Sequence, residues 1–122
     1  MKTKQVSDGH SHTIGKEGRK HKWYVKRLWQ LANDLPQFEY EVASFTGFDQ
    51  DFWFGDRIKP TIENVLAHHQ KIQNADLKFP IIISADGLIM DGVHRICKAR
   101  LEGRKTIPAV KFTQNPEPDE II

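Results

Sequence analysis

Residues 80–112 constrain the fold of this chain more than any other segment. Two apolar runs of strand length, Ile81–Ile83 and Leu88–Met90, are separated by four residues that end in Asp86 and Gly87. An Asp-Gly pair between two apolar runs is a strong signal for a tight turn between antiparallel strands. The spacing therefore predicts a β-hairpin.

A helix and a further strand are expected directly after this hairpin. Asp91 can cap a helix, Gly92 lets the chain turn into it, and Gly103 closes the segment. Residues 107–112 then predict a last strand. The apolar stripe of the expected helix consists of Val93, Ile96, Cys97 and Leu101.

The preceding part of the chain also mixes helices and strands. Residues 23–35 have apolar side chains at three- and four-residue intervals and predict an amphipathic helix that stops at a proline. Residues 38–46 begin with period-two alternation and predict a half-buried strand, whereas residues 48–54 are ambiguous between strand and loop. A second helix is expected to begin at Pro60 or Thr61. Its apolar face would consist of Ile62, Val65, Leu66, His69 and Ile72.

Charge divides the chain into three parts. Residues 1–30 hold eight Lys or Arg against two Asp or Glu, residues 31–112 are near balance, and residues 113–122 are acidic. We expect a flexible basic arm over residues 1–21, one domain over residues 22–112 and an acidic tail. The arm is either a solvated tail or a contact for nucleic acid or another polyanion.

Composition excludes several classes of protein. With 39% hydrophobic and 28% charged residues, the chain fits one globular domain of ordinary size. Its longest apolar stretch, residues 79–90, is interrupted by polar residues and cannot span a bilayer, and no apolar segment follows the charged N-terminus. A single cysteine, Cys97, excludes an internal disulfide. These features predict a cytoplasmic protein without a membrane partner.

The turn before the expected third helix is the best candidate for chemistry. A helix start offers backbone N–H groups and the positive end of the helix dipole, which together bind anions. His94, Arg95 and Lys98 would lie on one flank and add cationic donors. The pattern predicts a phosphate site. The alternative is that Asp91 is only a helix cap and that Arg95 and Lys98 form a solvated face.

The residues of this region also suggest a family. Gly87–Arg95 contains a Gly-x-His-Arg turn after a hairpin, and Lys98–Gly103 and Ile107–Val110 follow it, with Ile-Pro in the last strand. These segments resemble the ParB/sulfiredoxin superfamily, in particular small stand-alone ParB-like proteins. The resemblance covers about residues 48–112. It implies an α+β fold with a small mixed sheet packed with helices, to which residues 23–35 add an N-terminal helix.

The resemblance implies a nucleotide as the ligand. In that superfamily the turn and helix hold the phosphates of CTP in partition proteins, of ATP in sulfiredoxin, and of an adenine nucleotide in free-serine kinases. Carried over by position, Gly92, His94 and Arg95 become phosphate contacts, with Val93 in the same turn. The implied ligand is a nucleoside triphosphate with Mg²⁺.

This chain departs from both well-known branches of that family. Sulfiredoxin has its reactive cysteine where this chain has Val93, so sulfinic-acid reduction has no nucleophile here. Cys97 is one helical turn further on and is expected to be a buried, inert thiol. Partition proteins have two consecutive arginines at this turn, preceded by glutamate, and need a helix-turn-helix domain that these 122 residues do not contain.

Further polar residues have both a functional and a structural interpretation. Arg57 and Lys59 precede the second helix and could reach a phosphate from the opposite side, or form an exposed basic loop. His68 and His69 are adjacent on a helix, so their side chains point about 100° apart and do not easily share a metal. Another run could stack a base and hold Mg²⁺, or be a half-buried edge strand; it contains Asp49, Asp51 and Trp53.

Two classes of function remain open. In the first, the protein is a nucleotide-binding NTPase or phosphotransferase, in which Asp91 holds Mg²⁺ or positions a nucleophile. In the second, it is a non-catalytic DNA-binding accessory module of the partition type. The expected DNA contacts are the turn and the basic residues Lys16, Arg19, Lys20, Lys22, Lys26 and Arg27.

Overall fold

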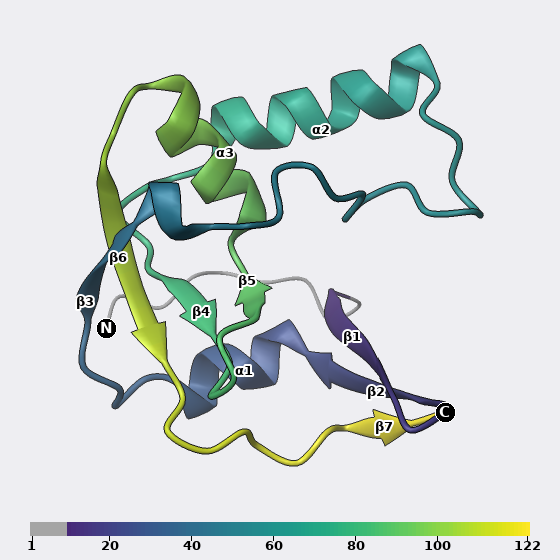
Figure 1. The fold of residues 1–122 in the computed structure, drawn as a ribbon, viewed down its shortest axis with the longest axis vertical. Coiled ribbons are helices and arrows are strands. Elements are labelled where there is room, and N and C mark those ends of the chain that lie inside the picture. Colours follow the sequence, from purple (N-terminus) through teal and green to yellow (C-terminus); the bar gives the residue numbers. More distant parts are fainter. Residues whose placement is uncertain (1–9) are drawn as a thin grey trace.

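The computed structural model describes residues 10–122, which contain three α-helices and two β-sheets (Figure 1). The predicted α+β class is confirmed. The elements are β1 (Ser11–Lys16), β2 (Arg19–Tyr24), α1 (Val25–Leu31), β3 (Phe38–Glu41), the 3-10 turn η1 (Val42–Ser44), α2 (Ile62–Asn74), β4 (Ile81–Ile83), β5 (Ile89–Asp91), α3 (Val93–Leu101), β6 (Thr106–Lys111) and β7 (Glu120–Ile121).

The larger sheet separates two apolar clusters. Its strand order is β3-β6-β4-β5, and β4 runs parallel to β6 while the other pairs are antiparallel. Because side chains alternate along a strand, Ile82 packs with residues of α1 on one face, whereas Ile81 and Ile83 pack with residues of α3 on the other. α1 and α3 therefore cover opposite faces, and α2 lies outside α3 (Figure 1).

The predicted hairpin, helix and strand after residue 80 are confirmed. β4 and β5 pair antiparallel, and the turn between them closes with a bond from the Ser84 amide to the Leu88 carbonyl at 2.8 Å. Gly87 has φ +92°, which favours glycine. α3 and β6 follow in the expected order.

The predicted basic arm is wrong for the residues that the structure describes. Residues 11–24 form the antiparallel pair β1–β2, in which Lys16 is opposite Arg19. The turn between them has positive φ at both Glu17 and Gly18, the geometry whose twist suits a two-residue hairpin loop. The rest of the arm, residues 1–9, lies outside the described residues.

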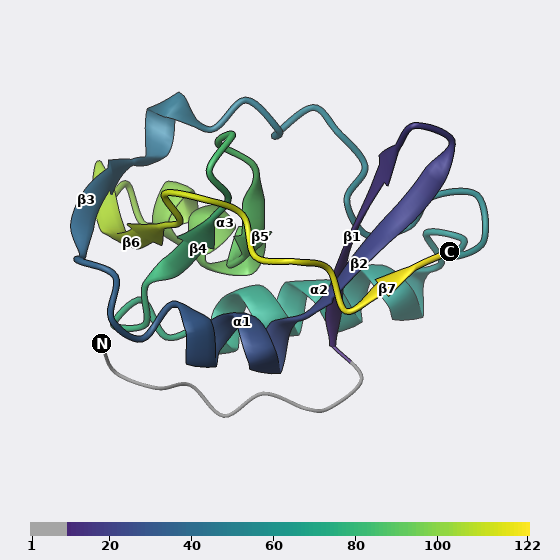
Figure 2. The same ribbon diagram turned by 90° about the horizontal axis from the view of Figure 1, so that it is seen from below.

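The acidic tail is also part of the fold. β7 pairs with β2, so that β1, β2 and β7 form a second, smaller sheet. Figure 2 shows the chain returning to β2 after it leaves β6. The Trp23 indole N–H donates to the Pro116 carbonyl at 2.8 Å, and Arg27 forms an ion pair with Asp119 at 3.2 Å. The tail packs because Trp23 and these charges hold it against β2.

Two predicted elements are shorter than expected. The helix predicted over residues 23–35 covers only Val25–Leu31, because Trp23 and Tyr24 belong to β2 and pair with β1. The strand predicted over residues 38–46 ends at Glu41, where η1 begins. The ambiguous residues 48–54 form turns rather than a strand.

α2 begins as predicted but presents a different face to the body. Thr61 is its N-cap, and its hydroxyl accepts a bond from the Asn64 amide at 3.2 Å. The expected apolar face is largely exposed: Ile62 is 81% and Leu66 58% accessible. The half-buried residues recur every fourth position as Asn64, His68 and Ile72. The prediction of the buried face is therefore wrong, because α2 packs on the polar flank of α3.

No helix within residues 10–122 is long and apolar enough to cross a membrane.

Candidate functional site

The turn from β5 into α3 has an open helix start. Gly92 is the N-cap with φ +120°, and no side chain bonds to the first amides of α3. The first helical bond runs from the Ile96 amide to the Gly92 carbonyl at 3.0 Å. The Val93 amide precedes this bond, where helical amides have no intrahelical acceptor. The predicted geometry of an anion-binding helix start is present.

Asp91 and Arg95 form a buried ion pair beneath this turn. Nη2 of Arg95 lies 3.2 Å from Oδ2 of Asp91, and Asp91 is 8% and Arg95 3% exposed. The Asp91 carboxylate also accepts the Trp29 indole N–H at 2.9 Å. The Arg95 guanidinium donates to the Pro80 carbonyl at 3.3 Å and lies over the Trp29 ring.

This pair corrects two expectations. Arg95 was expected on the polar flank of α3 as a phosphate contact, but its guanidinium is buried in the core and already bonded. Asp91 was expected to hold Mg²⁺ or position a nucleophile, but its carboxylate is bonded to Arg95 and Trp29. A buried charge needs such partners, because an unpaired one is expensive to remove from water. Both residues are therefore assigned to the structural support of the turn.

Lys98 is also used within the protein. Its ammonium donates to the carbonyls of Gln73 at 2.9 Å and Ala75 at 2.7 Å, at the end of α2. A cation at this end satisfies carbonyls that lack helical partners and complements the negative end of the dipole. Lys98 thus joins α3 to α2 and does not lie at the start of α3, which corrects its assignment as a phosphate contact.

His94 meets a residue that sequence analysis did not place in the site. Its Nε2 lies 3.0 Å from Nδ1 of His68 on α2, and the two ring planes differ by only 7°. The Trp53 indole stacks on both imidazoles, with ring centroids 4.6 Å from His68 and 4.7 Å from His94. We call His68 and His94 the imidazole pair and Trp53 its indole cover. Together they form one stacked cluster at the start of α3.

The imidazole pair is a coupled acid–base unit. One ring must donate and the other accept in their shared hydrogen bond, so only one proton lies between them. Burial lowers the pKa of His68, and the positive charge of Lys71 lowers it further. A second proton on the pair would place two cations in contact, which is unfavourable.

The loop that carries Trp53 is fixed by Asp51. Its carboxylate accepts three backbone amides, those of Trp53, Phe54 and Gly55, at 2.8–3.1 Å. These bonds, with that of Phe54 the largest, lower the pKa of Asp51. Asp51 is therefore a positioning residue for the indole cover. The segment is a loop, and the edge-strand interpretation of this run is wrong.

A small apolar slot lies between this loop and α3. It has a volume of about 140 Å³ and is lined mainly by Phe45, Phe48, Phe52, Trp53, Val93 and Cys97. Val93 contributes its side chain here. Burial raises the pKa of the Cys97 thiol, as expected for an inert, half-buried cysteine.

Arg57 and Lys59 lie in the exposed segment ahead of α2. The Lys59 backbone carbonyl accepts the Asn64 side-chain amide at 2.8 Å, which ties this segment to the first turn of α2. Within residues 10–122, no hydrogen bond, ion pair or ring contact joins either side chain to the start of α3. Within residues 10–122 no group of three or more His, Cys, Asp or Glu side chains could hold a metal ion.

Scans of protein-family models, curated proteins and solved structures find no match to this chain.

Proposed function

We propose that this protein binds a phosphate-bearing ligand, a nucleoside triphosphate with Mg²⁺, at the start of α3. The observation that carries the proposal is the uncapped helix start beside the imidazole pair and an aromatic-lined slot. The proposal includes membership of the ParB/sulfiredoxin superfamily, which rests on the Gly-x-His-Arg turn and its resemblance alone.

Each part of the site has a physical role in this proposal. The Val93 amide and the helix dipole attract an anion. A proton on the imidazole pair adds a positive charge next to them. The apolar slot accepts part of a flat base by stacking. Mg²⁺ would be carried by the phosphates, as is usual for nucleotide-bound magnesium.

The proposal is for binding rather than turnover. The carboxylate expected to position a nucleophile, Asp91, is bonded inside the core. The imidazole pair is the group of this site that could move a proton, but phosphoryl transfer depends mainly on positioning and charge neutralisation. NTPase or phosphotransferase activity is therefore not part of the proposal.

The ligand prediction is tested by thermal stability. A ligand that binds only the folded protein raises its Tm, and at about 100 times the Kd it adds about 2.7 kcal/mol. We expect at least one of ATP, CTP, GTP and UTP, with Mg²⁺, to raise the Tm by several degrees. The rise should be larger at about pH 5 than at about pH 8, because burial lowers the pKa of His68 from its ordinary value and the pair gains a proton only at the lower pH.

His94→Ala should remove this rise, and His69→Ala is the matched control because His69 is exposed on α2. His94→Gln, which keeps a polar side chain, guards against an effect of misfolding. The proposal is wrong if none of the four nucleotides shifts the Tm of the wild type, or if His94→Ala and His69→Ala respond alike.

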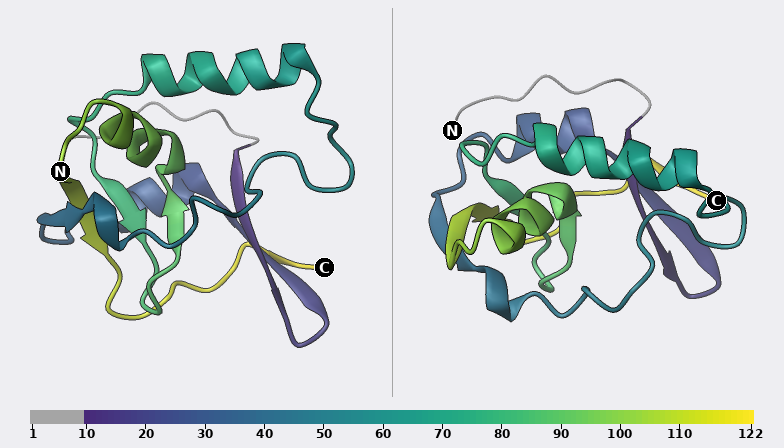
Figure 3. Two further views of the ribbon diagram at one scale, coloured as in Figure 1. Left: turned by 45° about the horizontal axis from the view of Figure 1, so that its top comes forward. Right: turned by 90° about the horizontal axis from the view of Figure 1, so that it is seen from above.

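DNA binding is the second candidate function, and the hairpin β1–β2 favours it. Figure 3 shows the hairpin projecting from the rest of the fold. The acidic tail neutralises cations at the hairpin base and in α1, through Lys22 with Glu120 and Arg27 with Asp119. The exposed cations of the tip are Lys16, Arg19 and Lys20. A two-stranded ribbon of this kind fits the major groove of DNA.

The hairpin prediction is tested by salt dependence on mixed-sequence duplex DNA. The triple variant Lys16→Ala, Arg19→Ala, Lys20→Ala should bind more weakly, and the slope of log K against log salt should fall by about 2 to 3. A control that removes the same charge replaces the exposed Lys71, Lys78 and Lys111 by alanine. Equal losses in both triple variants would exclude the hairpin as the DNA contact.

A further inference from the structure

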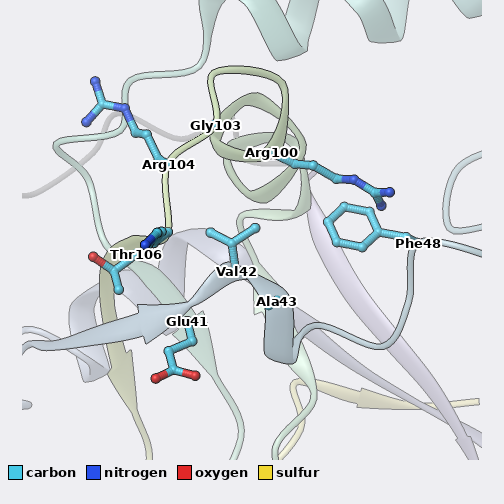
Figure 4. A pocket seen from close by; sticks show the side chains of 9 residues that line it. Glu41, Val42, Ala43, Phe48, Arg100, Gly103, Arg104 and Thr106 are labelled. Atoms are coloured by element: carbon cyan, nitrogen blue, oxygen red, sulfur yellow. The ribbon is translucent and has the colours of Figure 1, made fainter.

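A second and larger hollow lies at the C-terminal end of α3, whereas the imidazole pair lies at its start. Figure 4 shows this hollow from close by. It has a volume of about 790 Å³ and opens between the last turn of α3, the start of β6 and the segment around η1. This volume is within the range of small-molecule sites. No sequence pattern predicts this hollow, because its walls come from three separate segments.

One wall is a stacked pair of side chains. The Arg100 guanidinium lies over the Phe48 ring, 4.2 Å from its centroid, and the two side chains stand side by side at the rim (Figure 4). Phe48 is itself held edge-on against Phe45, with ring centroids 4.9 Å apart. The contact with the ring holds the guanidinium at the rim, and the edge of a guanidinium presents paired donors suited to a carboxylate or phosphate.

The backbone around the hollow is held in place without a ligand. The Val42 amide donates to the Lys105 carbonyl at 2.9 Å, which ties η1 to the chain just before β6. The Arg104 amide donates to the Ala99 carbonyl at 2.9 Å, and Gly103 takes φ +73° to close α3. A preformed site loses little conformational freedom when a ligand binds.

The charge of the lining favours an anion. Arg100 and Lys105 stand against one lining carboxylate, that of Glu41, whereas the third lining cation, Arg104, is paired with Glu102 at 3.0 Å. The buried Val42 side chain provides an apolar floor (Figure 4). Cations at a helix C-terminus are favourable in themselves. This favourable interaction with the helix dipole does not explain why Arg100 lies over the exposed Phe48 ring or why Val42 provides an apolar floor.

We infer that this hollow binds a small organic anion with a flat apolar body. The carboxylate or phosphate group of the ligand meets the edge of the Arg100 guanidinium and the Lys105 ammonium. Its apolar body lies over Val42, beside Phe48. The hollow adjoins the slot of the nucleotide site proposed above, because Phe48 lines both, but it lies at the other end of α3 and contains neither the imidazole pair nor the helix start.

Titration of the ¹⁵N-labelled protein with phenyl phosphate tests the inference. We expect the amide signals of Val42, Gly103 and Lys105 to shift, and those around the imidazole pair to shift less. Inorganic phosphate lacks the flat apolar body and phenol lacks the anionic group, so each should bind at least about fivefold more weakly than phenyl phosphate. Equal binding of either compound would contradict the inference.

Arg100→Ala should weaken phenyl phosphate binding about tenfold, the loss of one hydrogen-bonded charge pair. Arg100→Lys retains the charge but not the planar fork, so its affinity should fall between that of Arg100→Ala and the wild type. Lys111→Ala is the matched control because it removes one exposed charge at the other end of β6. The amide spectrum of each free variant reports its fold.

The inference is wrong if Arg100→Ala binds as tightly as Lys111→Ala. It is also wrong if the shifts centre on Val93 and His94, since phenyl phosphate would then occupy the proposed nucleotide site. Shifts at Val42 and Lys105 together with no nucleotide response would retain the inference and reject the proposed function.

Discussion

Arg95→Ala lowers the free energy of unfolding by about 3–5 kcal/mol, the range for removing one member of a buried ion pair. The substitution removes the guanidinium that pairs with the buried Asp91 carboxylate, and it removes the bond to the Pro80 carbonyl. It also removes the packing of the guanidinium on Trp29. Urea unfolding monitored by circular dichroism measures this loss.

Two further variants separate the causes of this loss. The double variant Arg95→Met, Asp91→Asn removes both charges and keeps an acceptor for the Trp29 indole, so it should recover part of the lost stability. Arg100→Ala removes an exposed arginine from the same helix and should cost less than about 1 kcal/mol. Equal stability of Arg95→Ala and Arg100→Ala would contradict the buried pair.

Gly92→Ala should lower the free energy of unfolding by about 2–5 kcal/mol, the sum of backbone strain and overpacking. Gly92 has φ +120°, a conformation that side-chain-bearing residues rarely adopt. An added Cβ would lie 2.4 Å from Cγ2 of Ile81 and 3.0 Å from Nη2 of Arg95. The new methyl group therefore strains the turn and disturbs the buried ion pair together.

Gly87→Ala is the matched control for this prediction. Gly87 has φ +92°, but an added Cβ would meet nothing within 4 Å. It therefore reports the cost of the backbone conformation alone, about 1–3 kcal/mol. Thermal unfolding of both variants gives the difference, and the packing argument fails if Gly92→Ala is no less stable than Gly87→Ala.

Local signals predicted the part of the fold that depends on neighbours in sequence. The Asp86-Gly87 turn, the Thr61 cap and the periodicity of α3 all act within a few residues, and the structure has all three elements. The hairpin β1–β2 is local, but its strands are mostly polar and lack an apolar pattern. The pairing of the acidic tail with β2 was missed because Trp23 and Pro116 are 93 residues apart. A charge run at a terminus contains no information about a partner at that distance.

The candidate site was predicted in position but not in composition. The turn at Gly92 and the placement of His94 agree with the sequence, whereas Arg95 and Asp91 are buried. Their four-residue spacing is that of a helical ion pair and was an available signal for pairing. The contact of His68 with His94 had no signal, since it depends on how α2 packs on α3.

The pairing of β2 with β7 has a consequence for the order of events during synthesis. β2 lies near the beginning of the sequence, but its partner residues Glu120 and Ile121 emerge from the ribosome about a hundred residues later. Until then one edge of β2 has no strand beside it and Trp23 has no acceptor from Pro116. The nascent hairpin therefore presents an open strand edge, which is a site of unwanted pairing with other chains.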